Sequence, residues 1–117
     1  MKFGKLWLAT LEEQYKNHYI NYNYLKGKIK YSQLLPNEFI KLLTNEMDKV
    51  EKFYSNNKNI LLKNFCVLNI LSILKITKKY NKYSQLNIWN NVYRILYNKT
   101  FYKDLYNTDI IENYINK

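Results

Sequence analysis

The residues of this chain best suited to chemistry are lysines that recur at helical spacing. Two sets stand out: Tyr22, Lys26 and Lys30, and then Lys75, Lys78, Lys79 and Lys82. On a helix, residues four apart advance by about 40° along one face, and the second set falls within roughly a 100° arc. Converging ammonium groups make charge-assisted hydrogen bonds to phosphate oxygens. The spacing therefore favours a polyanionic ligand.

The overall charge agrees with a polyanionic partner. The 117 residues include 19 Lys plus Arg and 9 Asp plus Glu, which gives a formal net charge of +10. No acid lies between Glu51 and Asp104, so nothing near the second lysine set in sequence offsets its repulsion. Nucleic acid and an anionic membrane surface remain open as partners. A further alternative needs no ligand: these lysines form a solvated helix end, where their charge complements the helix dipole.

Residues for catalysis or metal binding are scarce. The chain has one cysteine, Cys66, and one histidine, His18, which excludes a disulfide framework and a zinc site built on cysteines or clustered histidines. The sequence also lacks a nucleophile paired with a base, paired catalytic carboxylates and a phosphate-binding glycine loop. We expect no enzymatic activity, no cofactor and no metal.

The elements that position these residues are expected to be helices. Only two Gly and one Pro occur, and 47% of the residues are hydrophobic, a composition that favours long helices over many short strands. We expect one all-α domain over residues 1–117. Its expected parts are an N-terminal helical hairpin in 1–30 with helices near 6–11 and 15–30, a core pair in 36–82 with helices at about 36–54 and 60–81, and two short closing helices in 84–117, over 84–98 and 101–115.

The sequence predicts no membrane-spanning or targeting segment. The most apolar run, 65–74, is interrupted by Asn69 and Ser72 and has about half the length needed to cross a bilayer. The first residues lack the apolar core and cleavage site of a signal peptide. We therefore expect a soluble, cytoplasmic protein.

Three sequence blocks resemble the SPX domain family. They are Met1-Lys2-Phe3-Gly4-Lys5-Leu6 with Tyr19-Ile20-Asn21-Tyr22-Asn23-Tyr24-Leu25-Lys26; Phe39-Ile40-Lys41-Leu42-Leu43 with Glu46, Lys49-Val50 and Phe53-Tyr54; and Leu68-Asn69 with Lys75-Ile76-Thr77-Lys78-Lys79-Tyr80-Asn81-Lys82. The blocks occur in the family's order over residues 1–82. The segment between the second and third blocks is shorter than is usual in the family, so the central helical hairpin is expected to be truncated.

The resemblance implies a helical sensor of inositol polyphosphates and pyrophosphates. Such a sensor regulates a partner protein or domain, here in trans, in phosphate or polyphosphate homeostasis, in the cytoplasm or at the cytosolic face of a membrane through its partner. The carried-over site residues are Tyr22, Lys26 and Lys75, with Lys78, Lys79 and Lys82 as an adjoining surface. Lys2 is a secondary carry-over, and Lys30 is added by the spacing alone. The alternative is a basic helical nucleic-acid-binding domain, which charge and aromatic content alone support.

Overall fold

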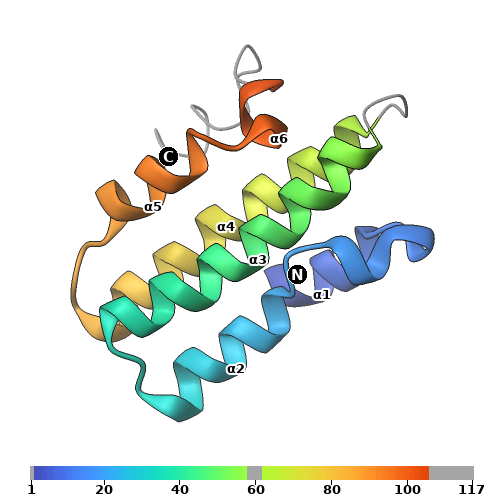
Figure 1. The fold of residues 1–117 in the computed structure, drawn as a ribbon. Helices are drawn as coiled ribbons and strands as arrows, with labels where there is room; N and C mark the ends of the chain where they lie inside the picture. The colour runs from blue at the N-terminus through green and yellow to red at the C-terminus, as the bar shows by residue number, and fades with distance from the viewer. Residues whose placement is uncertain (1, 58–61, 106–117) are drawn as a thin grey trace.

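The computed structural model describes residues 2–57 and 62–105, and within these ranges it is helical without strands, which confirms the all-α prediction. The elements are α1 (Phe3–Thr10), the 3₁₀ helix η1 (Glu13–His18), α2 (Tyr22–Ser32), α3 (Pro36–Asn56), α4 (Lys63–Ser84), α5 (Trp89–Leu96) and α6 (Thr100–Lys103). Figure 1 shows α3 and α4 along the centre of the view, with α2 on one side and α5 and α6 on the other. Side chains join the two central helices, as in the stacked rings of Phe39 and Tyr80.

Helix α3 begins and buries one face as its sequence predicts. Pro36 occupies the first turn, and the Glu38 carboxylate accepts a hydrogen bond from the Leu35 N–H at 2.8 Å. Proline suits this position because the first N–H groups of a helix have no intrahelical acceptor. The buried face is Phe39, Leu43, Met47 and Val50. The expected helix over about 36–54 is thus confirmed.

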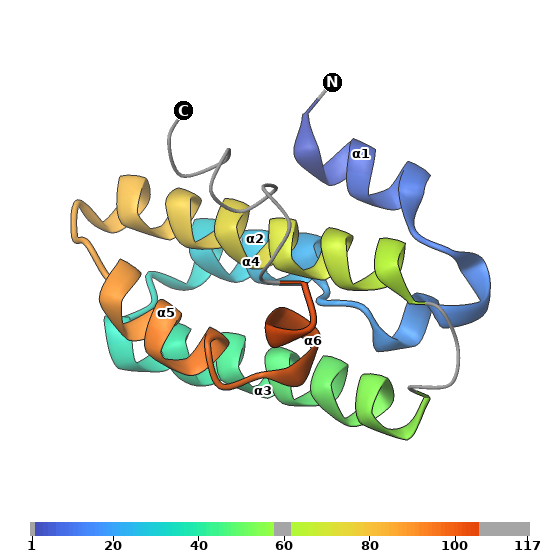
Figure 2. The same cartoon turned by 90° about the horizontal axis from the view of Figure 1, so that it is seen from above.

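Helix α4 is the central strut of the bundle. Its buried residues cover most of its circumference and include Cys66, Asn69 and Tyr80. Most of its residues that are not buried follow one stripe at helical spacing: Asn64, Val67, Leu71, Lys75, Lys78 and Lys82. A helix buried on most sides packs against several neighbours, and α1, α2 and α6 lie against α4 (Figure 2). The helix ends later than the predicted boundary at 81, at Ser84, where Gln85 takes a left-handed conformation with φ 61°. Residues 60 and 61 of the predicted helix lie outside the described residues.

The predicted helix over residues 15–30 is wrong in its first half. The chain forms η1 and then an extended connection at Tyr19, and α2 begins only at Tyr22. Tyr19 and Ile20 are buried, as a helical pattern would also require. The backbone leaves the helix here because the Ile20 N–H donates to the buried Asn69 side chain, and because Asn21 caps α2 by accepting from the Tyr24 N–H.

The closing helices are both short, and each is shorter than predicted, since α5 spans Trp89–Leu96 within the predicted 84–98. The Glu51 carboxylate accepts hydrogen bonds from the Thr100 N–H at 2.9 Å and from the Thr100 hydroxyl at 2.9 Å, which caps α6. Within the described residues α6 ends at Lys103, and the rest of the predicted helix, 106–115, lies outside them. In the two described ranges, no helix is both long enough and apolar enough to cross a membrane.

Candidate anion-binding site

A basic pocket of about 610 Å³ lies where α1, α2 and α4 meet. Its described lining residues are Lys2, Phe3, Gly4, Tyr22, Lys26, Ile29, Lys30, Lys79 and Tyr83. Four of these nine residues are lysines and none is an acid. Small-molecule sites in proteins have volumes of about 300–1,000 Å³, so the pocket has the size of a ligand site.

The start of α2 is held by side chains from both central helices. The Ile20 N–H donates to Asn69 Oδ1 of α4, and the Asn21 N–H donates to Glu46 Oε1 of α3, each at 2.7 Å. Asn69 is fully buried and also donates to the Phe65 carbonyl at 2.9 Å. These bonds fix where α2 begins, and they thereby fix the position of its lysines along the axis of α4.

The other end of α2 is tied to α4 by two tyrosine hydroxyls. Tyr80 donates to the Leu34 carbonyl at 2.8 Å, and Tyr83 donates to the Lys30 carbonyl at 3.2 Å. With Asn69 near the start of α2 and Tyr83 near its end, the two helices run parallel. The lysines on their C-terminal halves therefore lie at the negative ends of two helix dipoles, which favour cations.

Helix α1 approaches α2 closely at Gly4, where a larger residue would push the Asn23 side chain aside. A Cβ atom at Gly4 would lie 2.6 Å from Asn23 Oδ1 of α2, closer than any normal contact. The neighbouring Phe3 ring packs edge-on against the Tyr22 ring, with centroids 4.8 Å apart. This close approach brings Lys2 to the rim of the pocket.

Tyr22 presents a hydroxyl to the pocket from a buried ring. The side chain is only 4% exposed, and burial raises the pKa of its hydroxyl above the usual value. Its phenol is therefore protonated at neutral pH. No residue in 2–57 or 62–105 forms a hydrogen bond with that hydroxyl. Tyr22 can thus donate to a ligand in the pocket.

Lys79 is the electrostatic centre of the site. The pKa of its ammonium is lowered, first by burial and then by repulsion from Lys26, Lys82, Lys2 and Lys30. Four cations from three segments of the chain thus act on one ammonium group. We call these five residues the lysine cluster. A bound polyanion would relieve the repulsion within it.

The structure brings some of the sequence-predicted site residues together and leaves others apart. Tyr22, Lys26, Lys30, Lys79 and Lys2 line the pocket, and Lys82 acts on Lys79 through its charge. Lys75 and Lys78 are not among the described lining residues. Their place in the site stays a prediction from the family resemblance.

Sequence reasoning missed four lining residues, namely Phe3, Gly4, Ile29 and Tyr83. Tyr83 could have been found, because it follows Lys79 by four residues and shares its face of the helix. The part of the chain that the structure describes holds no group of three or more His, Cys, Asp and Glu side chains suited to a metal ion.

Comparisons with known proteins find a partial relative. The chain is 41% identical over 63 residues to "Vacuolar transporter chaperone complex subunit 4" of Schizosaccharomyces pombe. The similar stretch covers 48% of this chain and 9% of that protein, so the chain corresponds to a small part of it. No family model matches the chain. No solved structure matches it either.

Proposed function

We propose that the chain is a sensor module that binds inositol polyphosphates or pyrophosphates in the basic pocket. The observation that carries this proposal is the convergence of Lys2, Lys26, Lys30 and Lys79 on a pocket with no described acidic lining residue. Several ammonium groups around one concave site suit a compact ligand with many phosphates, because each can contact a different phosphate oxygen.

The shape of the site favours a compact ligand over an extended one. A nucleic-acid backbone is bound by cations spread along a surface, and its binding weakens steeply with added salt. Here four residues of the lysine cluster line a pocket whose walls include the apolar side chains of Phe3 and Ile29. A phosphorylated ring can fill such a pocket, whereas a nucleic acid would engage only its rim.

The proposed role is regulatory rather than catalytic. The pocket has donors for phosphate, but no described residue supplies an acid or a nucleophile beside them. Similarity to a subunit of a vacuolar transporter chaperone complex supports a role in phosphate or polyphosphate homeostasis. It also supports a protein partner, which this chain would regulate in trans on the cytoplasmic side of a membrane.

The test is calorimetric titration of the full chain with inositol hexakisphosphate at about 0.15 M salt, where exposed charges are screened beyond about 8 Å. Lys26→Ala and Lys79→Ala should each weaken binding by about 10- to 100-fold, since a hydrogen bond to a charged group contributes about 1.5–3 kcal/mol. Unchanged affinity in the double variant would refute the proposal.

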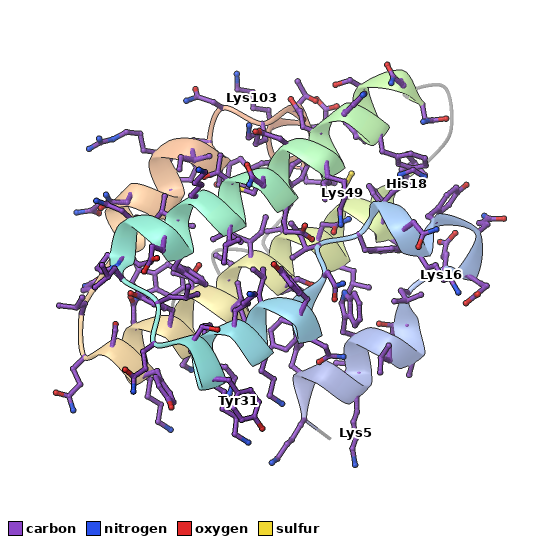
Figure 3. All side chains as sticks on the ribbon, turned by 60° about the horizontal axis from the view of Figure 1, so that its bottom comes forward. Lys5, Lys16, His18, Tyr31, Lys49 and Lys103 are labelled. Carbon is purple, nitrogen blue, oxygen red and sulfur yellow. The ribbon has the colours of Figure 1, made fainter. Side chains whose placement is uncertain are left out.

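Matched controls come from lysines outside the pocket. Lys5 lies on α1, close in sequence to Lys2, and Figure 3 shows its side chain projecting away from the bundle. Lys103 lies on α6, at the opposite side of the molecule in the same view. Lys5→Ala and Lys103→Ala should bind within about twofold of the wild type. An equal loss in all four variants, with competition by an oligonucleotide, would instead favour nucleic acid.

A further inference from the structure

Tyr83 forms part of the pocket wall but is not assigned to the site by the spacing or by the family resemblance. It lies in the last turn of α4, directly after Lys82, and lines the pocket together with Lys30 and Lys79. Its side chain is 58% exposed. The hydroxyl donates to the Lys30 carbonyl at 3.2 Å.

That hydrogen bond is long and the group is free to leave it. O–H···O hydrogen bonds in proteins have donor–acceptor distances of about 2.5–3.0 Å. One turn earlier in α4, Tyr80 makes the equivalent bond to the Leu34 carbonyl at 2.8 Å, and its side chain is only 2% exposed. The end of α4 thus carries one buried tyrosine with a tight bond and one exposed tyrosine with a loose bond beside the pocket.

A phosphate in the pocket would be a stronger acceptor than the carbonyl. Hydrogen bonds to an ionised acceptor are roughly twice as strong as neutral ones. Lys30 is itself exposed, so water can solvate its carbonyl once the Tyr83 hydroxyl turns away. The exchange therefore replaces a weak internal bond with a charge-assisted one.

We propose that Tyr83 is a further ligand-binding residue of the pocket, whose hydroxyl leaves the Lys30 carbonyl and donates to a phosphate oxygen of the bound inositol polyphosphate. This proposal rests on the proposed function of the site. It assigns the pocket a second phenol donor, on the α4 side, in addition to that of Tyr22 on α2. Tyr83 would thereby help to set which arrangements of phosphates on the ring are bound tightly.

The first experiment is titration of Tyr83→Phe with inositol hexakisphosphate, because this change removes only the hydroxyl. We expect roughly a tenfold loss of affinity, since the lost charged bond is partly offset by the internal bond already given up in the wild type. The matched control is Tyr97→Phe, a 47% exposed tyrosine at the end of α5 that does not line the pocket. It should bind as the wild type does.

The outcomes separate this proposal from the proposed function. Wild-type affinity in Tyr83→Phe, together with lost affinity in Lys26→Ala, would overturn the role of Tyr83 and leave the pocket assignment intact. A lower unfolding midpoint in Tyr83→Phe with unchanged affinity would mean that the hydroxyl only joins α2 to α4. Undiminished binding by Lys26→Ala and Lys79→Ala would overturn both.

A second measurement uses the wild-type side chain. In a chain carrying ¹³Cζ-labelled tyrosine, the resonance that is missing from Tyr83→Phe belongs to Tyr83. Titration with inositol hexakisphosphate should shift this resonance and that of Tyr22, while the resonance of Tyr97, at the end of α5, stays in place. A Tyr83 resonance that does not move at saturation would overturn the proposed exchange of acceptors.

Discussion

Replacing Lys79 with methionine should stabilise the free protein and weaken ligand binding at once. Methionine keeps an unbranched stem of similar length but removes the charge. The pKa of Lys79 is lowered by burial and by Lys26, Lys82, Lys2 and Lys30, which means that its positive charge destabilises the folded state. Removing that charge therefore raises the free energy of unfolding.

The size of the effect follows from the number of repelling neighbours. A like-charge pair on a helix surface costs about 0.2–0.5 kcal/mol, so four pairs give on the order of 1 kcal/mol after screening by solvent. For a domain of this size that corresponds to a rise of roughly 3–5 °C in the unfolding midpoint. In the complex the same lysine contacts a phosphate, and losing that contact should weaken binding by about 10- to 100-fold.

The assay combines urea or thermal unfolding of the free chain with calorimetric titration by inositol hexakisphosphate. Lys41→Met is the matched control, because Lys41 is an exposed residue of α3 outside the pocket, and it should change neither quantity appreciably. A lower unfolding midpoint in Lys79→Met would refute the repulsion argument. Undiminished affinity would refute the assignment of Lys79 to the site.

Three further predictions concern pH, the backbone and the thiol. Affinity for inositol hexakisphosphate should fall as the pH rises through the lowered pKa of Lys79, because only the ammonium form binds phosphate. Between that pKa and the usual 10.5 the free energy of unfolding of the free protein should rise. Titration and unfolding of Lys79→Met across alkaline pH should show neither trend. Gly27→Ala should raise the free energy of unfolding, measured in urea, by about 0.5–1 kcal/mol, since a Cβ at Gly27 meets nothing within 4 Å. A lower free energy of unfolding would mean that α2 needs glycine at this position. Burial, then Asp104 and Glu51, raise the pKa of the Cys66 thiol to about 12, so iodoacetamide at pH 8 should modify it only in denaturant, and rapid alkylation of the native chain would contradict its burial.

Helices with one apolar face were predictable from the sequence, and so were the residues on their other faces. The pattern of α3 gave its bounds closely. The spacing of Tyr22, Lys26 and Lys30 predicted one shared face of α2, and all three line the pocket. An amphipathic helix has a single favourable rotation, because its apolar stripe must face the core. The sequence alone therefore predicts which residues lie on the polar face of such a helix.

The rotation of α4 could not be predicted in this way. Apolar residues such as Val67 and Leu71 also lie on the stripe of α4 that is not buried, so the apolar pattern alone did not mark the side of the helix that faces the core. The arc of four lysines left open which of them face α2. Packing turns Lys79 and Tyr83 towards α2, while Lys75 and Lys78 do not line the pocket. The break in the helix before α2 could not be predicted from the apolar pattern either, because Tyr19 and Ile20 are buried although they lie in an extended segment. The hydrogen-bond acceptor of that segment, Asn69, lies far along the chain.

Contacts that do not use the lysine ammonium groups build the site and hold the lysine cluster together against its own repulsion. Asn69 and Glu46 fix the start of α2, and Tyr80 fixes the segment after its end. On the core side, Leu25 and Ile29 are almost completely buried, and each contributes about 1.5–3 kcal/mol to the free energy of unfolding. These contributions exceed the roughly 1 kcal/mol of repulsion around Lys79. The cluster is therefore assembled before a ligand arrives, and an entering polyanion gains the energy of relieving that repulsion without reorganising the helices.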